Sequence, residues 1–169
     1  MTMTHEKFSQ TARVLAIASS LTLGSMAVLA QTAAVKVEGA WARATVQGQM
    51  GTGAFMSLTA KEGTTLIGVS SPIAGVAEVH EMKMEGDIMK MRAMPVLDLP
   101  AGKKVDLKPG GFHVMLMDLK APLAKDSTVP MTLLFKNAQG VRSKLELKLP
   151  VSAVAPSTVV GGPPAAHKH

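Results

Sequence analysis

The chain has 169 residues, of which 47% are hydrophobic, only 3% are aromatic and none is cysteine, and its net charge is +6. This composition is typical of a globular protein of one domain and is too hydrophobic for a disordered chain. The absence of cysteine excludes disulfides, cysteine nucleophiles, zinc–thiolate sites, iron–sulfur clusters and blue-copper electron-transfer centres, which need a thiolate ligand.

Residues 1–30 predict a secretory signal peptide. Two basic residues precede an apolar stretch, residues 14–30, and the small side chain of Ala30 favours cleavage between Ala30 and Gln31. The alternative is an uncleaved membrane anchor, but the stretch is at the short limit for a span and contains several Ser, Thr and Gly residues. We therefore expect an exported protein without a transmembrane span after cleavage, with a mature charge of +5 from 16 basic and 11 acidic residues.

Residues 31–150 predict one domain of short β-strands, because alternating apolar segments are separated by Gly, Pro and Asn turns. No segment there has the length and period of a conventional helix. We predict an all-β fold, an antiparallel two-sheet sandwich or barrel with Greek-key connections. The expected strands span residues 35–46, 53–59, 64–70, 76–84, 88–94, 104–107, 112–119, 130–136 and 141–149.

Residues 151–169 predict a flexible C-terminal tail, because they are rich in Pro and Gly. The tail ends with His167 and His169 on either side of a lysine. This pair could bind a divalent metal such as Cu(II) weakly, and the alternative is a disordered polar end.

Methionine and histidine gather in one part of the predicted domain. Beyond residue 30 the chain holds ten methionines, seven of them between residues 82 and 117, and two of its four remaining histidines, His80 and His113, lie in or beside this region. In the strand expected at 112–119, alternation places His113, Met115 and Met117 on one face and aliphatic or aromatic residues on the other. One histidine and two methionines are unusual residues on a face exposed to water.

A predicted hairpin gives the same picture. Gly86-Asp87 suits a two-residue type II′ turn, which has Gly first. The register that follows places His80 and four methionines on one face, with charged residues such as Glu81 and its partner Arg92 on the other, and a turn longer by one residue would break it. The cross-strand pairs would be Glu85 with Ile88, Met84 with Met89, Met82 with Met91, and His80 with Ala93.

The chemistry of this face favours monovalent copper. Thioether sulfur is a soft, neutral ligand that prefers Cu(I) to zinc, iron or calcium, and imidazole accepts most transition metals. Two His and two Met would form a roughly tetrahedral site that needs no thiolate and so suits an oxidising compartment. The alternative is that the methionines only fill the core, since Met packs well into irregular gaps.

The spacing of these residues resembles the periplasmic copper chaperones of the PCu(A)C type. His80, Met91, His113 and Met115 follow the family's H-x₁₀-M-x₂₁-H-x-M pattern, and the surrounding segments 39–45, 53–56, 79–92 and 110–119 are also similar. The resemblance covers residues 35–150. It implies a cupredoxin-like β-sandwich that binds one Cu(I) through these four residues. Met82, Met84 and Met117 share the predicted metal face, and we expect them to lie near the ion without binding it.

The resemblance also implies a periplasmic location, a role and partners. Members of the family take up copper in the periplasm and supply it for cytochrome c oxidase assembly, often beside a thioredoxin-like copper chaperone. Many carry a C-terminal extension rich in His and Met that binds Cu(II). The tail of this chain departs from that pattern, because it has only His167 and His169 and no Met.

Two other functions remain open from the sequence. One is a copper-storage or resistance binder that uses the same site without delivering the metal. The other is a metal-free β-sandwich interaction module with a methionine-rich core. We do not expect an enzyme, because no nucleophile motif or Gly-rich phosphate loop is present. We do not expect a nucleic-acid partner, because the basic residues are dispersed and have few aromatic neighbours.

Overall fold

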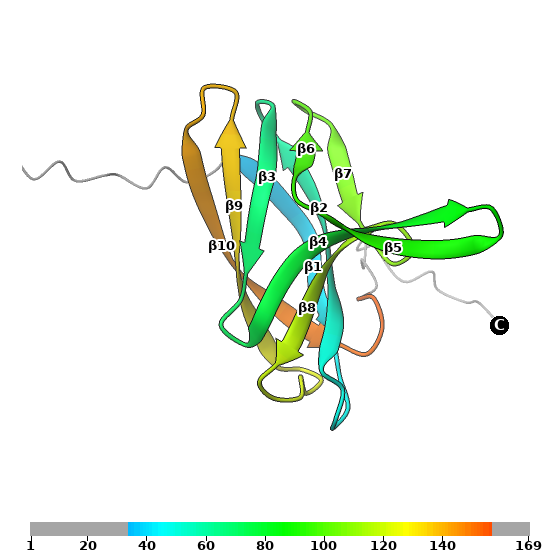
Figure 1. Ribbon diagram of the computed structural model, residues 1–169. Coiled ribbons are helices and arrows are strands. Elements are labelled where there is room, and N and C mark those ends of the chain that lie inside the picture. Colours follow the sequence, from blue (N-terminus) through cyan, green and yellow to red (C-terminus); the bar gives the residue numbers. More distant parts are fainter. Residues whose placement is uncertain (1–33, 157–169) are drawn as a thin grey trace, which may run out of the picture.

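The computed structural model describes residues 34–156 (Figure 1). The predicted signal peptide with its cleavage site, and His167 and His169 of the predicted tail, lie outside the described residues. Within residues 34–156 the chain forms ten strands and no helix. None of the described segments is therefore a helix long and apolar enough to cross a membrane.

All nine predicted strands are present, and four of them have the predicted bounds. A tenth strand, β6, was not predicted, because its three residues lie between Pro95 and Pro100 and are too few to show an alternation. The last strand ends at Ser152, so that it includes the first two residues of the predicted tail. The strands are β1 (Val35–Arg43), β2 (Gly51–Ala60), β3 (Thr64–Ser70), β4 (Ala74–Glu85), β5 (Ile88–Met94), β6 (Leu97–Leu99), β7 (Lys104–Leu107), β8 (Phe112–Leu119), β9 (Thr128–Asn137) and β10 (Arg142–Ser152).

The strands form one sheet in the order β5-β4-β8-β7-β2-β1-β10-β9-β3-β6. The sheet folds over where β1 meets β10, so that strands β5 to β1 of this order form a first layer and strands β10 to β6 a second (Figure 1). The chain passes repeatedly between the layers, as in a Greek key, and the predicted all-β sandwich is confirmed. Most pairings are antiparallel as predicted, but β1 pairs with β10, and β7 with β8, in parallel.

The hydrophobic core lies between the two layers. Aliphatic and aromatic side chains from both layers are completely buried there, including Leu58 and Leu116 of the first layer and Leu133 and Phe135 of the second. On β4 and β8 the cross-strand partners Val79 and Val114 belong to this core. Because side chains alternate along a strand, the neighbours of these valines lie on the outer face of the first layer.

A long hairpin of β4 and β5 projects from the body of the sandwich (Figure 1). Its two-residue turn is the predicted one: Gly86 has a φ of +62°, whereas Asp87 is not among the residues with positive φ, as a type II′ turn requires. The predicted register is confirmed at each pair, including Met84 with Met89 and Met82 with Met91. The hairpin therefore carries its methionines on one face and its charged residues on the other.

Candidate metal centre

His80 and His113 are direct cross-strand partners on the outer face of the first layer. Their Cα atoms pair across β4 and β8, and their ring centroids are 6.0 Å apart. Both are buried, with 9% and 5% of their surface exposed, although they do not point into the core. The fold thus brings together the two separate segments that carry these imidazoles.

Gly111 fixes the ring of His113. The Nδ1 atom of His113 lies 3.0 Å from the Gly111 carbonyl oxygen, which can only accept a hydrogen bond. Nδ1 is therefore the protonated nitrogen, and the neutral ring keeps its lone pair on Nε2. The same carbonyl accepts the backbone N–H of Met82 at 3.1 Å, so that Gly111 also holds the base of the projecting hairpin.

Glu78 contacts the second imidazole. Its Oε2 atom lies 3.2 Å from Nε2 of His80, which makes Nε2 the donor and leaves the lone pair on Nδ1. That Nδ1 is buried without a hydrogen-bond partner. An unpaired buried polar atom is costly, and its presence is expected where an ion or another ligand is bound.

The two rings are compatible with one shared ion. An ion bonded to one nitrogen of each ring at about 2.0 Å would hold the ring centroids roughly 5–6 Å apart. The observed separation is 6.0 Å. Each ring also has one nitrogen engaged by a protein acceptor, the arrangement that orients histidine ligands in metal proteins.

Met115 and Met91 lie on the same outer face as the two histidines. Met115 is half-buried in β8, two residues after His113, and pairs with Glu78 on one side and Gly53 on the other. Met91 lies in β5 opposite Met82, two cross-strand pairs along the hairpin from the pair of His80 with Ala93. It is 51% exposed, so that the four predicted ligands include one that solvent and other molecules can reach.

An aromatic cluster borders the site and was not predicted from the sequence. The rings of Trp41 and Phe55 are 4.8 Å apart, and the Phe55 ring centroid is 6.5 Å from that of His113. The guanidinium of Arg43 lies 5.4 Å from the centre of Phe55. One strand face carries Gly51, Gly53 and Phe55 in alternation. This pattern indicates a surface on which larger side chains can fold.

Gly53 makes room for this cluster. A Cβ atom at Gly53 would lie 2.6 Å from Cζ of Phe55, closer than real Cβ contacts allow. A Cβ at Gly51 would meet only ordinary contacts, with the Met115 methyl carbon at 3.9 Å. The absence of a side chain at Gly53 therefore allows the Phe55 ring to lie beside His113.

Hard ligands do not gather elsewhere on the described part of the chain. Residues 34–156 contain no group of three or more His, Asp or Glu side chains placed to hold a metal ion. The thioethers beside His80 and His113 are therefore what could complete a ligand set, and they favour a soft ion.

Four charged side chains of the hairpin near the site form two ion pairs. On the face of the hairpin away from the methionines, Glu81 pairs with Arg92 at 2.8 Å and Glu85 with Lys90 at 2.7 Å. Farther away, the pKa of Glu38 and that of Glu146 are lowered by hydrogen bonds from Lys36 and Lys144, respectively. The methionine face itself carries neutral ligands, apart from the carboxylate of Glu78.

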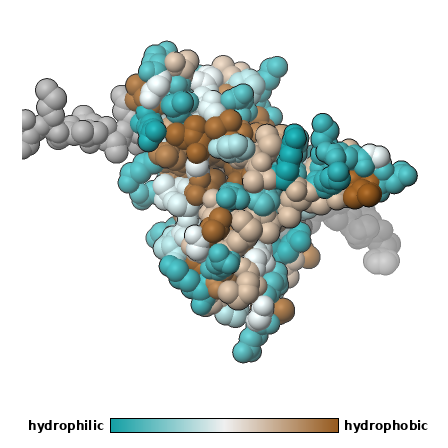
Figure 2. Space-filling view, viewed as in Figure 1, coloured by the Kyte–Doolittle hydropathy of each residue, from teal (hydrophilic) through white to brown (hydrophobic). Residues whose placement is uncertain are grey.

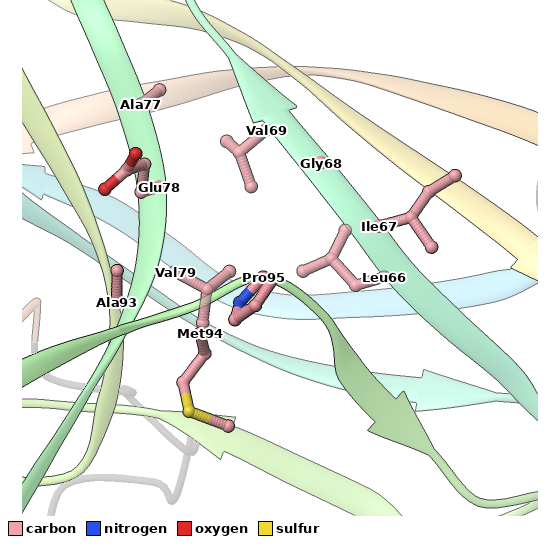
Figure 3. A pocket seen from close by; sticks show the side chains of 10 residues that line it. All are labelled: Leu66, Ile67, Gly68, Val69, Ala77, Glu78, Val79, Ala93, Met94 and Pro95. Atoms are coloured by element: carbon pink, nitrogen blue, oxygen red, sulfur yellow. The ribbon is translucent and has the colours of Figure 1, made fainter.

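A cleft of about 390 Å³ lies between β3 and the β4–β5 base, on the other side of β4 from the candidate metal centre. Figure 3 shows its apolar walls, with Leu66 and Val69 facing Val79 and Pro95, while the carboxylate of Glu78 is turned away from β3. None of the four predicted ligands lines this cleft. The cleft and the candidate metal centre therefore share no proposed ligand, although Glu78 borders both.

Comparisons with known proteins give one family match and one curated relative. The family described as "Putative lipoprotein LpqE-like" matches residues 35–151. A protein of Leifsonia xyli subsp. xyli named "Putative lipoprotein Lxx21020" is 32% identical over 108 residues, which are 63% of this chain and 65% of that protein. The match thus spans slightly less than two thirds of that relative.

Solved structures share the fold. The copper-bound PCuAC domain from PmoF2 is 25% identical, with a TM-score of 0.57 over 73% of this chain and 97% of that domain. Apo-DR1885 from Deinococcus radiodurans is 30% identical, with a TM-score of 0.53 over 89% of this chain and 96% of that one. Its Cu(I) form is 28% identical, with a TM-score of 0.55 over 75% and 82%. These likenesses confirm the cupredoxin-like sandwich.

Proposed function

The chain belongs to the LpqE-like family, and from this premise we propose that it is a periplasmic metallochaperone that binds one Cu(I) as cargo and passes it to an acceptor protein. The observation that carries the proposal is the buried pair His80 and His113, whose rings lie 6.0 Å apart with Nδ1 of His80 unpartnered. The solved PCuAC domains with the same fold include copper-bound forms, one of them with Cu(I).

The proposed ligands are Nδ1 of His80, Nε2 of His113 and the thioether sulfurs of Met91 and Met115. All four side chains belong to one face of neighbouring strands β5, β4 and β8. Four neutral ligands of this kind leave the bound ion a monocation and select Cu(I) over harder metals. Such a site works without cysteine, which this chain lacks.

Delivery rather than storage is supported by the exposure of Met91. A storage site gains from enclosure, whereas a site that transfers its ion needs a ligand that an acceptor can replace. Met91 is 51% exposed on a hairpin that stands clear of the body (Figure 1). A neutral thioether also binds copper less tightly than a thiolate, so that exchange at this position is favourable for release.

The acceptor we propose is a copper site of the respiratory chain, in cytochrome c oxidase assembly, reached directly or through a thioredoxin-like copper chaperone. This part rests on the resemblance of residues 35–150 to the PCu(A)C family. Export through the predicted signal peptide would place the chain in the compartment where such acceptors are loaded.

An anaerobic Cu(I) titration against a competing chelator tests the site. Replacing Met91 or Met115 with Leu should weaken Cu(I) binding sharply, because Leu keeps the volume and removes the sulfur. The matched control is Met50→Leu, an exposed methionine of the loop before β2. Equal Cu(I) affinity of the Met91 and Met115 variants and the parent would show that the ligand assignment is wrong.

A mixing experiment separates delivery from storage. The Cu(I)-loaded protein and an apo copper domain of cytochrome c oxidase are combined, separated again and assayed for copper. Transfer to the acceptor supports the chaperone role. Retention of the copper on this chain, under conditions in which free Cu(I) loads the acceptor, would instead identify a storage protein.

A further inference from the structure

The tip of the β4–β5 hairpin carries methionines that the proposed site does not use. Met84 and Met89 are direct cross-strand partners next to the turn, and each is about half exposed, at 54% and 49%. The hairpin stands away from the core (Figure 1), and Figure 2 shows hydrophobic atoms at its outer end among hydrophilic ones. Core packing therefore does not explain why both positions hold methionine.

The exposed methionines form a continuous row with the proposed site. The Met84–Met89 pair is followed by the Met82–Met91 pair and then by His80, all on one face. Two residues of a strand span roughly 7 Å, so that the row leads from the tip to the imidazoles in two steps of about that length. Met91 belongs to the proposed site and neighbours the tip.

Three thioethers can meet at the tip. Met84 and Met89 are opposite each other, where Cβ atoms are about 5 Å apart, and Met82 is the diagonal neighbour of Met89. Methionine has three rotatable side-chain bonds, so that the sulfurs of these residues can approach a common point without backbone movement. A set of thioethers without imidazole is a ligand set for Cu(I) and is poor for zinc, calcium or magnesium.

Charged side chains lie on the opposite face of the hairpin and form two cross-strand ion pairs. Glu85 and Lys90 are joined by an ion pair of 2.7 Å beside the turn, and Glu81 and Arg92 by one of 2.8 Å nearer the body. These pairs join the two strands in the same register that aligns the methionine row. The methionine face remains without charged side chains from Met82 to Met91.

We propose that Met82, Met84 and Met89 form a second Cu(I) site at the hairpin tip, made of thioethers only and weaker than the His/Met site. It is the point at which Cu(I) enters from or leaves to another molecule, and Met91 connects it to the buried imidazoles. The proposal rests on the proposed function for the identity of the ion, but the two sites are tested by different residues.

Anaerobic titration with Cu(I) alone, in competition with a chromophoric Cu(I) chelator, measures the second site. The parent should take up about two Cu(I) ions per chain. The Met84→Leu/Met89→Leu variant should take up about one, with the same affinity as the tighter of the two ions in the parent. Leu preserves the apolar surface, so that a loss of copper reports on sulfur and not on hydrophobicity. Ile88→Leu, at the same turn but on the other face, is the matched control and should keep both ions.

A second set of variants tests the hairpin tip in a protein that lacks the main site. In a His80→Ala/His113→Ala variant the remaining Cu(I) should show only sulfur neighbours in X-ray absorption, and adding Met84→Leu and Met89→Leu should abolish that uptake. Saturation of the parent at a single Cu(I), or undiminished uptake by the Met84/Met89 variant, would overturn the second site. Either result would leave the His/Met site intact. Failure of the proposed function would instead appear as a parent protein that binds no Cu(I) ion tightly.

Discussion

Two groups of methionines in this molecule have the same chemistry and opposite surroundings. Met56 and Met131 are 3% and 2% exposed in the core, where they fill space between the layers. Met84, Met89 and Met91 are about half exposed on the hairpin, at 54%, 49% and 51%. The buried pair is explained by packing alone, whereas the exposed group is explained by what thioether sulfur can bind. Exposure on a defined face, and not the number of methionines, therefore distinguishes the two roles.

The largest effect is expected in the core group. Met131→Ala should lower the free energy of unfolding by about 2–5 kcal/mol, because a buried side chain is lost and a cavity remains. The Cu(I) affinity of the folded protein should not change, since β9 belongs to the second layer. Urea unfolding and Cu(I) competition measure the two quantities. A stability equal to that of the parent would contradict the packing role.

The reverse pattern is expected for the exposed group. Met91→Ala should reduce Cu(I) affinity by roughly 100-fold, about 2.7 kcal/mol, because one of the proposed ligands is removed. The free energy of unfolding should change by less than about 0.5 kcal/mol, as is usual for surface positions. Met50→Ala, equally exposed but outside the hairpin, should change neither quantity. If Met91→Ala unfolds the apo protein instead, the distinction between the two groups fails.

The aromatic cluster offers a sharper comparison between two glycines on one strand. Gly53→Ala should destabilise the protein by about 1–3 kcal/mol, because the new Cβ would lie 2.6 Å from Cζ of the buried Phe55 ring. Gly51→Ala is the control, since its nearest neighbour would be an ordinary contact at 3.5 Å. Thermal unfolding of both variants, with and without Cu(I), measures the effect. Equal melting temperatures for the two variants would show that the Phe55 ring can move away at no cost.

The sequence predicts much of this arrangement because strand alternation and turn chemistry are local. The Gly86-Asp87 turn determines the register of the hairpin, and this register places Met82 opposite Met91 as expected. The direct pairing of His80 with His113 joins segments far apart in the chain, and the sequence pattern indicated only a shared face. The alternation of Gly51, Gly53 and Phe55 indicates a surface on which larger side chains fold. The position of Phe55 beside His113 and the contact of Glu78 with His80, however, depend on the packed side chains.

The smallest predicted effect concerns Glu78, which touches a proposed ligand and does not bind the ion. Its carboxylate accepts a hydrogen bond from Nε2 of His80 at 3.2 Å and thereby keeps the lone pair on Nδ1. Glu78→Gln should weaken Cu(I) binding by about tenfold, since carboxylate partners of metal-bound histidines typically contribute 10–100-fold to affinity. The Cu(II)/Cu(I) potential of the site should rise as well, because a neutral amide makes the imidazole a poorer donor to the harder ion.

Glu81→Gln is the matched control for that experiment. Glu81 lies on the same strand, and its carboxylate pairs with Arg92 on the other face, away from the imidazoles. Because a surface ion pair contributes little, this variant should leave both the Cu(I) affinity and the potential unchanged. A shift of equal size in the two variants would mean that Glu78 acts only through net charge. A shift confined to Glu78→Gln would show that the carboxylate acts through the His80 ring, which links the outer face of β4 to the copper chemistry of the hairpin.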